Sequence, residues 1–181
     1  MENSAAILLR RTKLTETSLI LTWLSEEHGK IRTVAKGARE AKSRFTGRLD
    51  LFFECEIQFS RSRRSELHSL REVALRTAHE GLRADYHLVT LASYFVELIE
   101  LVTEPEHPVP EIFNLLQRAL RHINVRPPSL RVLEHFEAEL ARSLGIQEPS
   151  VSPAESIRRA YHHLPRARRE IVTAMQESGQ K

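Results

Sequence analysis

The sequence contains a single cysteine, Cys55. One cysteine excludes an intramolecular disulfide and a cysteine-rich zinc site, and it favours a reducing compartment. The first four residues lack the basic region of a signal peptide, and the longest early apolar run, Ala5–Leu9, is too short to cross a membrane. These absences predict a cytoplasmic protein without a membrane partner.

The sequence also lacks the motifs that mark common enzyme classes. It has no phosphate-binding Gly-x-x-x-x-Gly-Lys-Ser/Thr loop, no Gly-x-Gly-x-x-Gly and no Gly-x-Ser-x-Gly turn. The adjacent His162 and His163 would point about 100° apart on a helix. His135 and Glu139 share a helical face but make only part of a zinc site. We therefore predict a protein that is not an enzyme and that holds no metal or cofactor.

Charge is unevenly distributed along the 181 residues. The whole chain has 27 Lys and Arg against 24 Asp and Glu, a net charge of +3. Residues 1–76 carry 15 cations and 10 acids, whereas residues 77–181 carry 12 cations and 14 acids. We expect nucleic acid to bind the first half, which leaves the second half for other partners.

The excess of positive charge is concentrated between residues 30 and 48. Seven cations lie there against one acid, Glu40, and Gly37 and Gly47 bracket the middle of the segment. Its weak apolar periodicity predicts a flexible loop that follows the phosphates of an extended strand, and Phe45 is a candidate for stacking on a base. The alternative is a solvated turn without a partner. The predicted nucleic-acid-binding residues are Lys30, Arg32, Lys36, Arg39, Lys42, Arg44, Phe45 and Arg48.

Short alternating segments in the first half predict β-strands. They are rich in Ile, Leu, Thr and aromatic residues and are separated by turn-forming residues. The expected strands are Ala5–Arg10, Thr17–Leu24, Lys30–Ala35, Leu49–Phe59 and Glu66–Ala78. Five strands in so short a stretch favour a barrel or rolled sheet, because closure removes unpaired edges. The aromatic residues expected in its core are Trp23, Phe52, Phe53 and Phe59.

The second half changes to a helical period. Apolar residues recur every three or four positions in Asp85–Thr103, and Ser152 and Glu155 form a capping box. The expected helices are Asp85–Thr103, one from Pro110 to Ile123, Ser129–Leu144, one that starts at Ser152 and one after Pro165. The sequence therefore predicts a two-domain α+β protein, with a barrel in residues 1–78 and an all-α domain in residues 79–181.

Two further basic clusters each allow two interpretations. Residues 61–64 can extend the nucleic-acid track or keep a hairpin link soluble. Residues 166–169 can bind an acidic partner or line the exposed side of the last helix. For the second cluster, the exposed helix face is the simpler interpretation.

Three ordered motifs of the first half resemble the RecO family of bacterial recombination mediators. They are His28-Gly-Lys, Ala35-Lys-Gly-Ala-Arg39 and Ser43-Arg-Phe-Thr-Gly-Arg-Leu49. The resemblance implies an N-terminal OB-fold that binds single- and double-stranded DNA, followed by a helical domain. The positions to which it assigns DNA binding are Lys30, Lys36, Arg39, Lys42, Arg44 and Arg48.

The same resemblance implies a set of partners. Members of the family promote strand annealing, work with the RecR protein and help load the RecA recombinase onto DNA coated by single-stranded DNA-binding protein. The acidic tail of that coating protein docks on the helical domain, and no member hydrolyses a nucleotide. A cytoplasmic, nucleoid-associated bacterial protein is implied.

One departure from the family pattern concerns zinc. Many members carry a cysteine-rich zinc loop after the helix that corresponds to Ser129–Leu144, but residues 145–153 hold no cysteine. We therefore expect a compact, zinc-free relative. The predicted function is that of a DNA-binding recombination mediator. The alternatives are a helical adaptor whose basic loop binds an acidic protein segment, and a single-stranded RNA-binding OB-fold protein.

Overall fold

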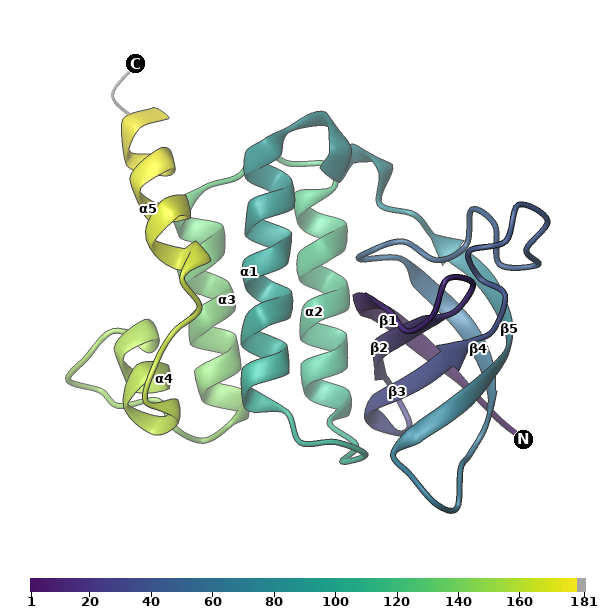
Figure 1. Ribbon diagram of the computed structural model, residues 1–181. Coiled ribbons are helices and arrows are strands. Elements are labelled where there is room, and N and C mark those ends of the chain that lie inside the picture. Colours follow the sequence, from purple (N-terminus) through teal and green to yellow (C-terminus); the bar gives the residue numbers. More distant parts are fainter. Residues whose placement is uncertain (179–181) are drawn as a thin grey trace. The chain divides into compact units, whose positions relative to one another are not determined.

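The computed structural model describes residues 1–178 and begins with five β-strands that close into a barrel (Figure 1). The strands are β1 (Glu2–Lys13), β2 (Leu19–Ser25), β3 (Gly29–Ala35), β4 (Glu54–Ser60) and β5 (Leu67–Thr77). Their order around the barrel is β1-β2-β3-β5-β4; β3 and β5 pair in parallel, and the other neighbours pair antiparallel. The predicted five-stranded OB-fold barrel is confirmed.

The aromatic side chains of the strands lie inside the protein. Trp23 is fully buried, and its indole Nε1 donates to the Thr33 Oγ1 at 2.9 Å, so the polar atom of the ring is satisfied within the core. Phe53 and Phe59 belong to the same buried cluster, and Phe52 is also buried. The prediction that these four rings are buried is confirmed.

Strand β4 begins five residues later than predicted. Residues 49–53 alternate in sequence like a strand, yet the backbone turns there. Phe52 has a φ of +69°, and the Phe53 N–H donates to the Asp50 carbonyl at 3.3 Å. Leu49 and Phe53 are nevertheless buried in the barrel core. The alternation of apolar residues arises because this irregular segment packs into the core. Alternation in the sequence alone does not distinguish such a segment from a β-strand.

Helices follow the barrel close to the predicted places. They are the short 3₁₀ helix η1 (Glu80–Ala84), then α1 (Tyr86–Val102), α2 (Pro110–Ile123), α3 (Leu130–Ser143), α4 (Pro153–Tyr161) and α5 (Ala167–Ser178). The Ser129 hydroxyl caps α3 by accepting from the Val132 N–H. The Ser152 hydroxyl caps α4 in the same way by accepting from the Glu155 N–H. The periodicity did not indicate η1, whose five residues are too few for a helical pattern.

The chain forms two compact units, and the barrel unit is not continuous in sequence. It comprises Met1–His79 together with Thr103–Phe113, whereas the helical unit comprises Glu80–Val102 and the residues from Asn114 onward. Thr103–Phe113, which the sequence placed in a helical domain of residues 79–181, thus belongs to the barrel unit. The last three residues of that predicted domain lie outside the described part of the chain. Within residues 1–178, no helix is long and apolar enough to cross a membrane.

The segment that follows α1 attaches to the turn between β2 and β3. The Glu106 N–H donates to the Lys30 carbonyl at 2.9 Å, and the Lys30 ammonium donates to the Thr103 carbonyl at 2.5 Å. A Cβ atom on Gly29 would lie 1.9 Å from the His107 carbonyl oxygen, and the φ of Gly29 is +67°. Glycine is required at this close approach of two backbones. The glycine of the family motif His28-Gly-Lys therefore has a structural explanation.

Arg61 also binds the segment that follows α1. Its guanidinium donates to the Glu2 carboxylate at 2.9 Å and also pairs with Glu106. The hydrogen bond from Arg61 lowers the pKa of Glu2. Arg61 therefore does not belong to a free basic track, whereas its neighbours Arg63 and Arg64 are exposed.

A buried polar network lies in the helical unit. The Tyr94 hydroxyl donates to the Glu137 carboxylate at 2.6 Å, and the Arg168 Nε donates to the same carboxylate at 2.6 Å. Burial is the main cause that raises the pKa of Tyr94. Arg168 therefore stabilises the helical unit from within, although the sequence favoured an exposed helix face for residues 166–169.

Replacing Gly29 with alanine is expected to destabilise the barrel unit, because the new methyl group would collide with the His107 carbonyl. Gly47→Ala is the matched control, since its φ is +72° and nothing lies within 4 Å of the added Cβ. Urea unfolding should show a loss of about 1–2 kcal/mol for the control, from backbone strain alone, and a clearly larger loss for Gly29→Ala. Equal losses would contradict the role given to the close approach.

Candidate nucleic-acid interface

The basic segment between β3 and β4 is built from consecutive turns. Backbone hydrogen bonds join residues three apart: Glu40 N–H to Gly37 carbonyl and Ser43 N–H to Glu40 carbonyl, both at 3.1 Å. The same pattern continues from Ser43 to Thr46 and from Phe45 to Arg48. We call residues 36–53 the basic loop. It has a defined turn structure, in contrast to the flexible loop that the sequence predicted.

Two apolar residues anchor the basic loop in the barrel. Phe45 is only 3% exposed and Leu49 only 8%, and both belong to the buried cluster formed by the strands. The Arg44 guanidinium covers the outer side of the Phe45 ring at 4.8 Å from its centroid. The ring is almost wholly covered, and it also takes part in lining a surface hollow of the barrel unit. We assign Phe45 an anchoring role, and its stacking on a base stays a prediction.

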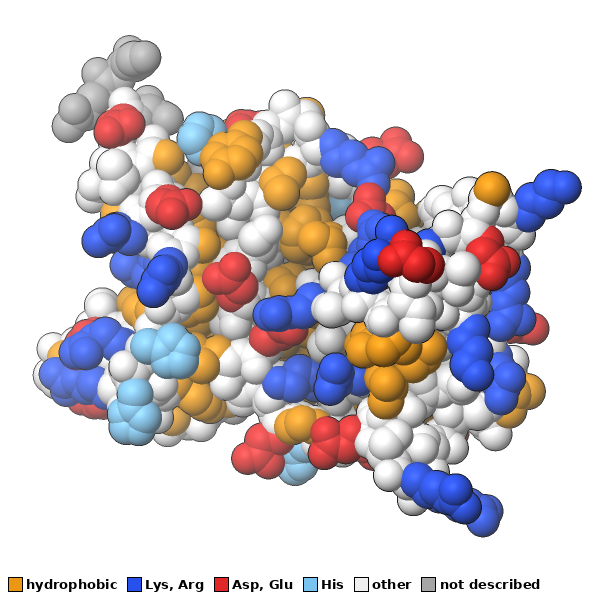
Figure 2. Space-filling view, viewed as in Figure 1, with side chains coloured by type: hydrophobic (Ala, Val, Ile, Leu, Met, Phe, Trp, Pro, Cys, Tyr) orange, Lys and Arg blue, Asp and Glu red, His pale blue; other side chains and the backbone are white. Residues whose placement is uncertain are grey.

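Four cations of the basic loop point to solvent without a carboxylate partner. Lys36, Lys42, Arg44 and Arg48 are exposed, and among residues 1–178 none of them has an Asp or Glu oxygen within 4.0 Å. Figure 2 shows Lys and Arg side chains projecting from the barrel surface. Because unpaired like charges repel one another, binding of a polyanion to this surface is electrostatically favourable.

Arg39 and Lys30 have structural partners instead. The Arg39 guanidinium donates to the Thr15 and Glu16 carbonyls at 3.2 and 3.0 Å, and the backbone N–H of Arg39 donates to the Thr17 carbonyl. It thereby ties the basic loop to the β1–β2 turn. Lys30 lies at the opposite end of β3 from the loop, about 17 Å along the strand from Ala35. The structure therefore separates Lys30 from the cluster to which the sequence assigned it.

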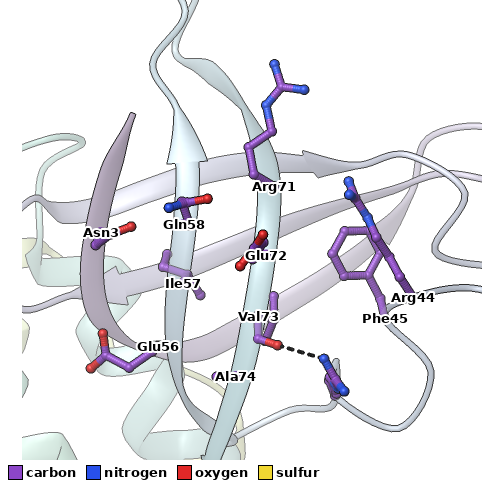
Figure 3. Close-up of a pocket in the computed structure, with 11 residues that line it drawn as sticks. Asn3, Arg44, Phe45, Glu56, Ile57, Gln58, Arg71, Glu72, Val73 and Ala74 are labelled. Atoms are coloured by element: carbon purple, nitrogen blue, oxygen red, sulfur yellow. Dashed lines mark hydrogen bonds between the residues drawn. The ribbon is translucent and has the colours of Figure 1, made fainter.

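Arg48 is held in place by the barrel while its side chain stays exposed. Its guanidinium donates to the Val73 carbonyl at 3.3 Å, the dashed line in Figure 3. The Cys55 thiol lies 3.8 Å from the Arg48 carbonyl and donates to it. Burial raises the pKa of Cys55 to about 12, so this thiol remains protonated and is not a nucleophile at neutral pH.

Sequence reasoning missed one exposed arginine, Arg71 on β5. It lies with Arg44 and Arg48 around a surface hollow of about 580 Å³ on the outer face of β1, β4 and β5 (Figure 3). The available signal was a break in the alternation of β5. Leu70 and Val73 are buried, whereas both residues between them are exposed. Two outward residues in succession indicate a β-bulge.

Metal chemistry has no support in the described residues. Within residues 1–178, no group of three His, Cys, Asp or Glu side chains is placed to hold a metal ion. His135 lines a groove of the helical unit, and Glu139 is paired with Arg142. Their shared helical face therefore does not develop into a metal site.

The groove in the helical unit is a second candidate surface. It has a volume of about 540 Å³ and lies between α2 and α3. Apolar side chains form its floor and cationic or titratable side chains form its rim. The floor residues are Leu115, Ala119, Val132 and Phe136, and the rim residues are Arg118, His122, Arg131 and His135. Such a surface suits a peptide that is both acidic and apolar.

Two family models match the chain, "Recombination protein O N terminal" over residues 1–79 and "Recombination protein O C terminal" over residues 83–152. The DNA repair protein RecO of Rhodopirellula baltica is 33% identical over 140 residues, which cover 77% of this chain and 52% of that protein. The proteins of the same name from Cutibacterium acnes and Synechococcus elongatus are 38% and 37% identical. Their matches cover 77% and 74% of this chain, and 57% and 49% of theirs. The chain spans about half the length of the curated relatives it matches.

Phe45→Leu tests the anchoring role of the ring. Leucine keeps an apolar side chain in the core but removes the aromatic face, so we expect a small loss of stability, below about 1.5 kcal/mol, and unchanged affinity for a single-stranded oligonucleotide. Phe45→Ala should instead cost about 3–5 kcal/mol by leaving a cavity. Thermal unfolding and fluorescence anisotropy measure the two effects. A large loss of affinity in a stable Phe45→Leu protein would support the stacking role instead.

Proposed function

The chain belongs to the recombination protein O (RecO) family, and on that premise we propose that it is a non-enzymatic DNA-binding mediator of recombination in DNA repair. It binds single- and double-stranded DNA, promotes annealing of complementary strands and assists loading of a recombinase. The names of its relatives, DNA repair protein RecO, support the repair context. Its place of action is then the bacterial cytoplasm, in association with the nucleoid.

The observation that carries this proposal is the set of unpaired cations on an anchored loop. Lys36, Lys42, Arg44 and Arg48 are exposed without carboxylate partners, while buried Phe45 keeps the loop fixed to the barrel. Cations held in place before binding lose little conformational freedom when phosphates arrive. They contact the backbone rather than base edges, which agrees with a mediator that acts on DNA of any sequence. Arg32, exposed on β3, and Arg39 are secondary contributors in this proposal.

Protein partners belong to the helical unit in this proposal. A RecR-like mediator and the acidic tail of single-stranded DNA-binding protein are the expected partners. The groove between α2 and α3 supports the second of these, because its apolar floor and cationic rim complement an acidic segment that carries an apolar residue. In this proposal the basic loop binds DNA, and the groove binds the protein that coats the DNA.

The cationic loop is tested by Lys36→Ala/Lys42→Ala/Arg44→Ala. We expect affinity for a labelled single-stranded oligonucleotide to fall roughly tenfold or more at physiological salt, and the slope of log affinity against log salt to become shallower by about 2. The charge-matched control is Lys13→Ala/Arg76→Ala/Arg142→Ala, in which each removed cation pairs with a carboxylate. Fluorescence anisotropy at several salt concentrations measures both variants.

Two results would contradict this proposal. If the loop variant and the control lose affinity equally, general charge rather than the loop attracts the DNA. If the unmodified protein binds an RNA of the same length more tightly than DNA, or an acidic peptide displaces the DNA from the loop, one of the alternative functions takes its place.

Arg118→Ala/Arg131→Ala is expected to weaken binding of an acidic peptide that ends in an apolar residue, because both cations lie on the rim of the groove. Arg142→Ala is the control, since that arginine lies on α3 and pairs with Glu139. The same variants should bind oligonucleotide normally. Anisotropy of the labelled peptide measures the effect, and equal peptide affinity in all three proteins would remove the groove from the proposal.

A further inference from the structure

We propose that the backbone of the bound DNA strand crosses the outer face of β4 and β5, where Arg71 is a DNA-binding residue together with Arg44 and Arg48. This inference rests on the proposed function and adds the route of the strand over the barrel. OB-folds commonly bind their ligands on the face of strands 2 and 3. The arrangement of charge in this barrel favours a different face.

Arg71 lies in a β-bulge of β5 and is exposed. Gln58 on β4 pairs with Glu72 and Phe59 pairs with Leu70, so Arg71 is an extra residue on β5. The bulge places two exposed residues, Arg71 and Glu72, in succession between the buried Leu70 and Val73. The Arg71 Nε donates to the Ser60 hydroxyl at 2.9 Å, and its terminal nitrogens have no partner among residues 1–178. They remain available for a phosphate.

Three guanidinium groups from two parts of the barrel unit lie around one hollow. Arg44 and Arg48 come from the basic loop, and Arg71 comes from β5 (Figure 3). None of the three has an Asp or Glu oxygen within 4.0 Å in the described chain. Their mutual repulsion is relieved when phosphates bind around the rim.

The lining of the hollow combines polar side chains with the apolar residues Phe45, Ile57, Val73 and Ala74. Asn3, Gln58 and Glu72 lie in register across β1, β4 and β5. Glu56 is neutralised by Arg76, whose guanidinium lies 2.8 Å from it. Glu72 has no such cation and repels a phosphate from the centre, so the two amides and this carboxylate face the bases or sugars of the strand.

The rival face lies on β2 and β3. Its outward residues include Ile20, Thr22 and Val34, and Arg32 is the exposed cation there. Lys30 on the same strand is half-buried and donates to the Thr103 carbonyl. Each route meets one exposed arginine of the strands that has no carboxylate partner within residues 1–178, Arg32 on β3 or Arg71 on β5. Arg71, however, lines the same hollow as the loop residues Arg44 and Arg48, and Arg32 does not.

Arg71→Ala and Arg76→Ala form a matched pair. Both arginines are exposed extra residues in bulges of β5, but Arg76 pairs with Glu56 and lies outside the hollow. In anisotropy titrations with a labelled single-stranded oligonucleotide, we expect Arg71→Ala to weaken binding several-fold and to make the salt slope shallower by about 0.7, the value for one phosphate contact. Arg76→Ala should leave both quantities unchanged. Thermal unfolding confirms that both variants are folded.

Arg32→Ala tests the rival route. If Arg32→Ala reduces affinity and the salt slope while Arg71→Ala does not, the strand follows β2 and β3 and the inference is wrong. The proposed function then stands, provided that Lys36→Ala/Lys42→Ala/Arg44→Ala still loses affinity. If the unmodified protein binds no oligonucleotide, the proposed function and the inference both fail.

Discussion

The burial of Phe45 and Leu49 in the barrel core is the constraint on which the proposed DNA-binding surface depends. These two residues belong to the most highly charged segment of the chain, yet they are 3% and 8% exposed. Their burial removes apolar surface from water and thereby offsets the entropy lost in ordering the loop. The cations between and beside them are consequently held at fixed positions on the barrel. A loop without these anchors would present the same charge from a changing ensemble of conformations.

The three family motifs acquire separate physical roles in this account. His28-Gly-Lys receives the segment after α1, because Gly29 alone admits the His107 carbonyl. The middle motif uses Arg39 to bind the backbone of the β1–β2 turn. The third motif buries Phe45 and exposes Arg44 and Arg48 on either side of it. Several residues of these motifs therefore have structural roles, and the proposed binding role rests on the fewer cations that have no carboxylate partner.

The element pattern could be predicted from the sequence because it follows from local periodicity and capping. Alternation located the strands, and capping residues such as Ser129 and Ser152 located helix starts. The errors lie where long-range packing decides. Charge and the family resemblance grouped Lys30 with the loop cations, although it lies at the opposite end of β3 and donates to the Thr103 carbonyl. The binding roles of Lys30 and Arg39 stay predictions. The attachment of Thr103–Phe113 to the barrel unit depends on tertiary contacts that no local pattern encodes. The bulge at Arg71 left a local signal, two polar residues between Leu70 and Val73, but the hollow beside it depends on the packing of the basic loop.

Amide hydrogen exchange of the basic loop, with and without single-stranded DNA, tests the central claim most directly. The account predicts that the Thr46 and Arg48 amides, which donate to the Ser43 and Phe45 carbonyls, exchange slowly in the free protein and change little when DNA binds. Exchange at the rate of an unstructured chain without DNA, followed by protection when DNA is added, would contradict it. Such a result would mean that the loop folds on its ligand and that burial of Phe45 does not hold the cations in place.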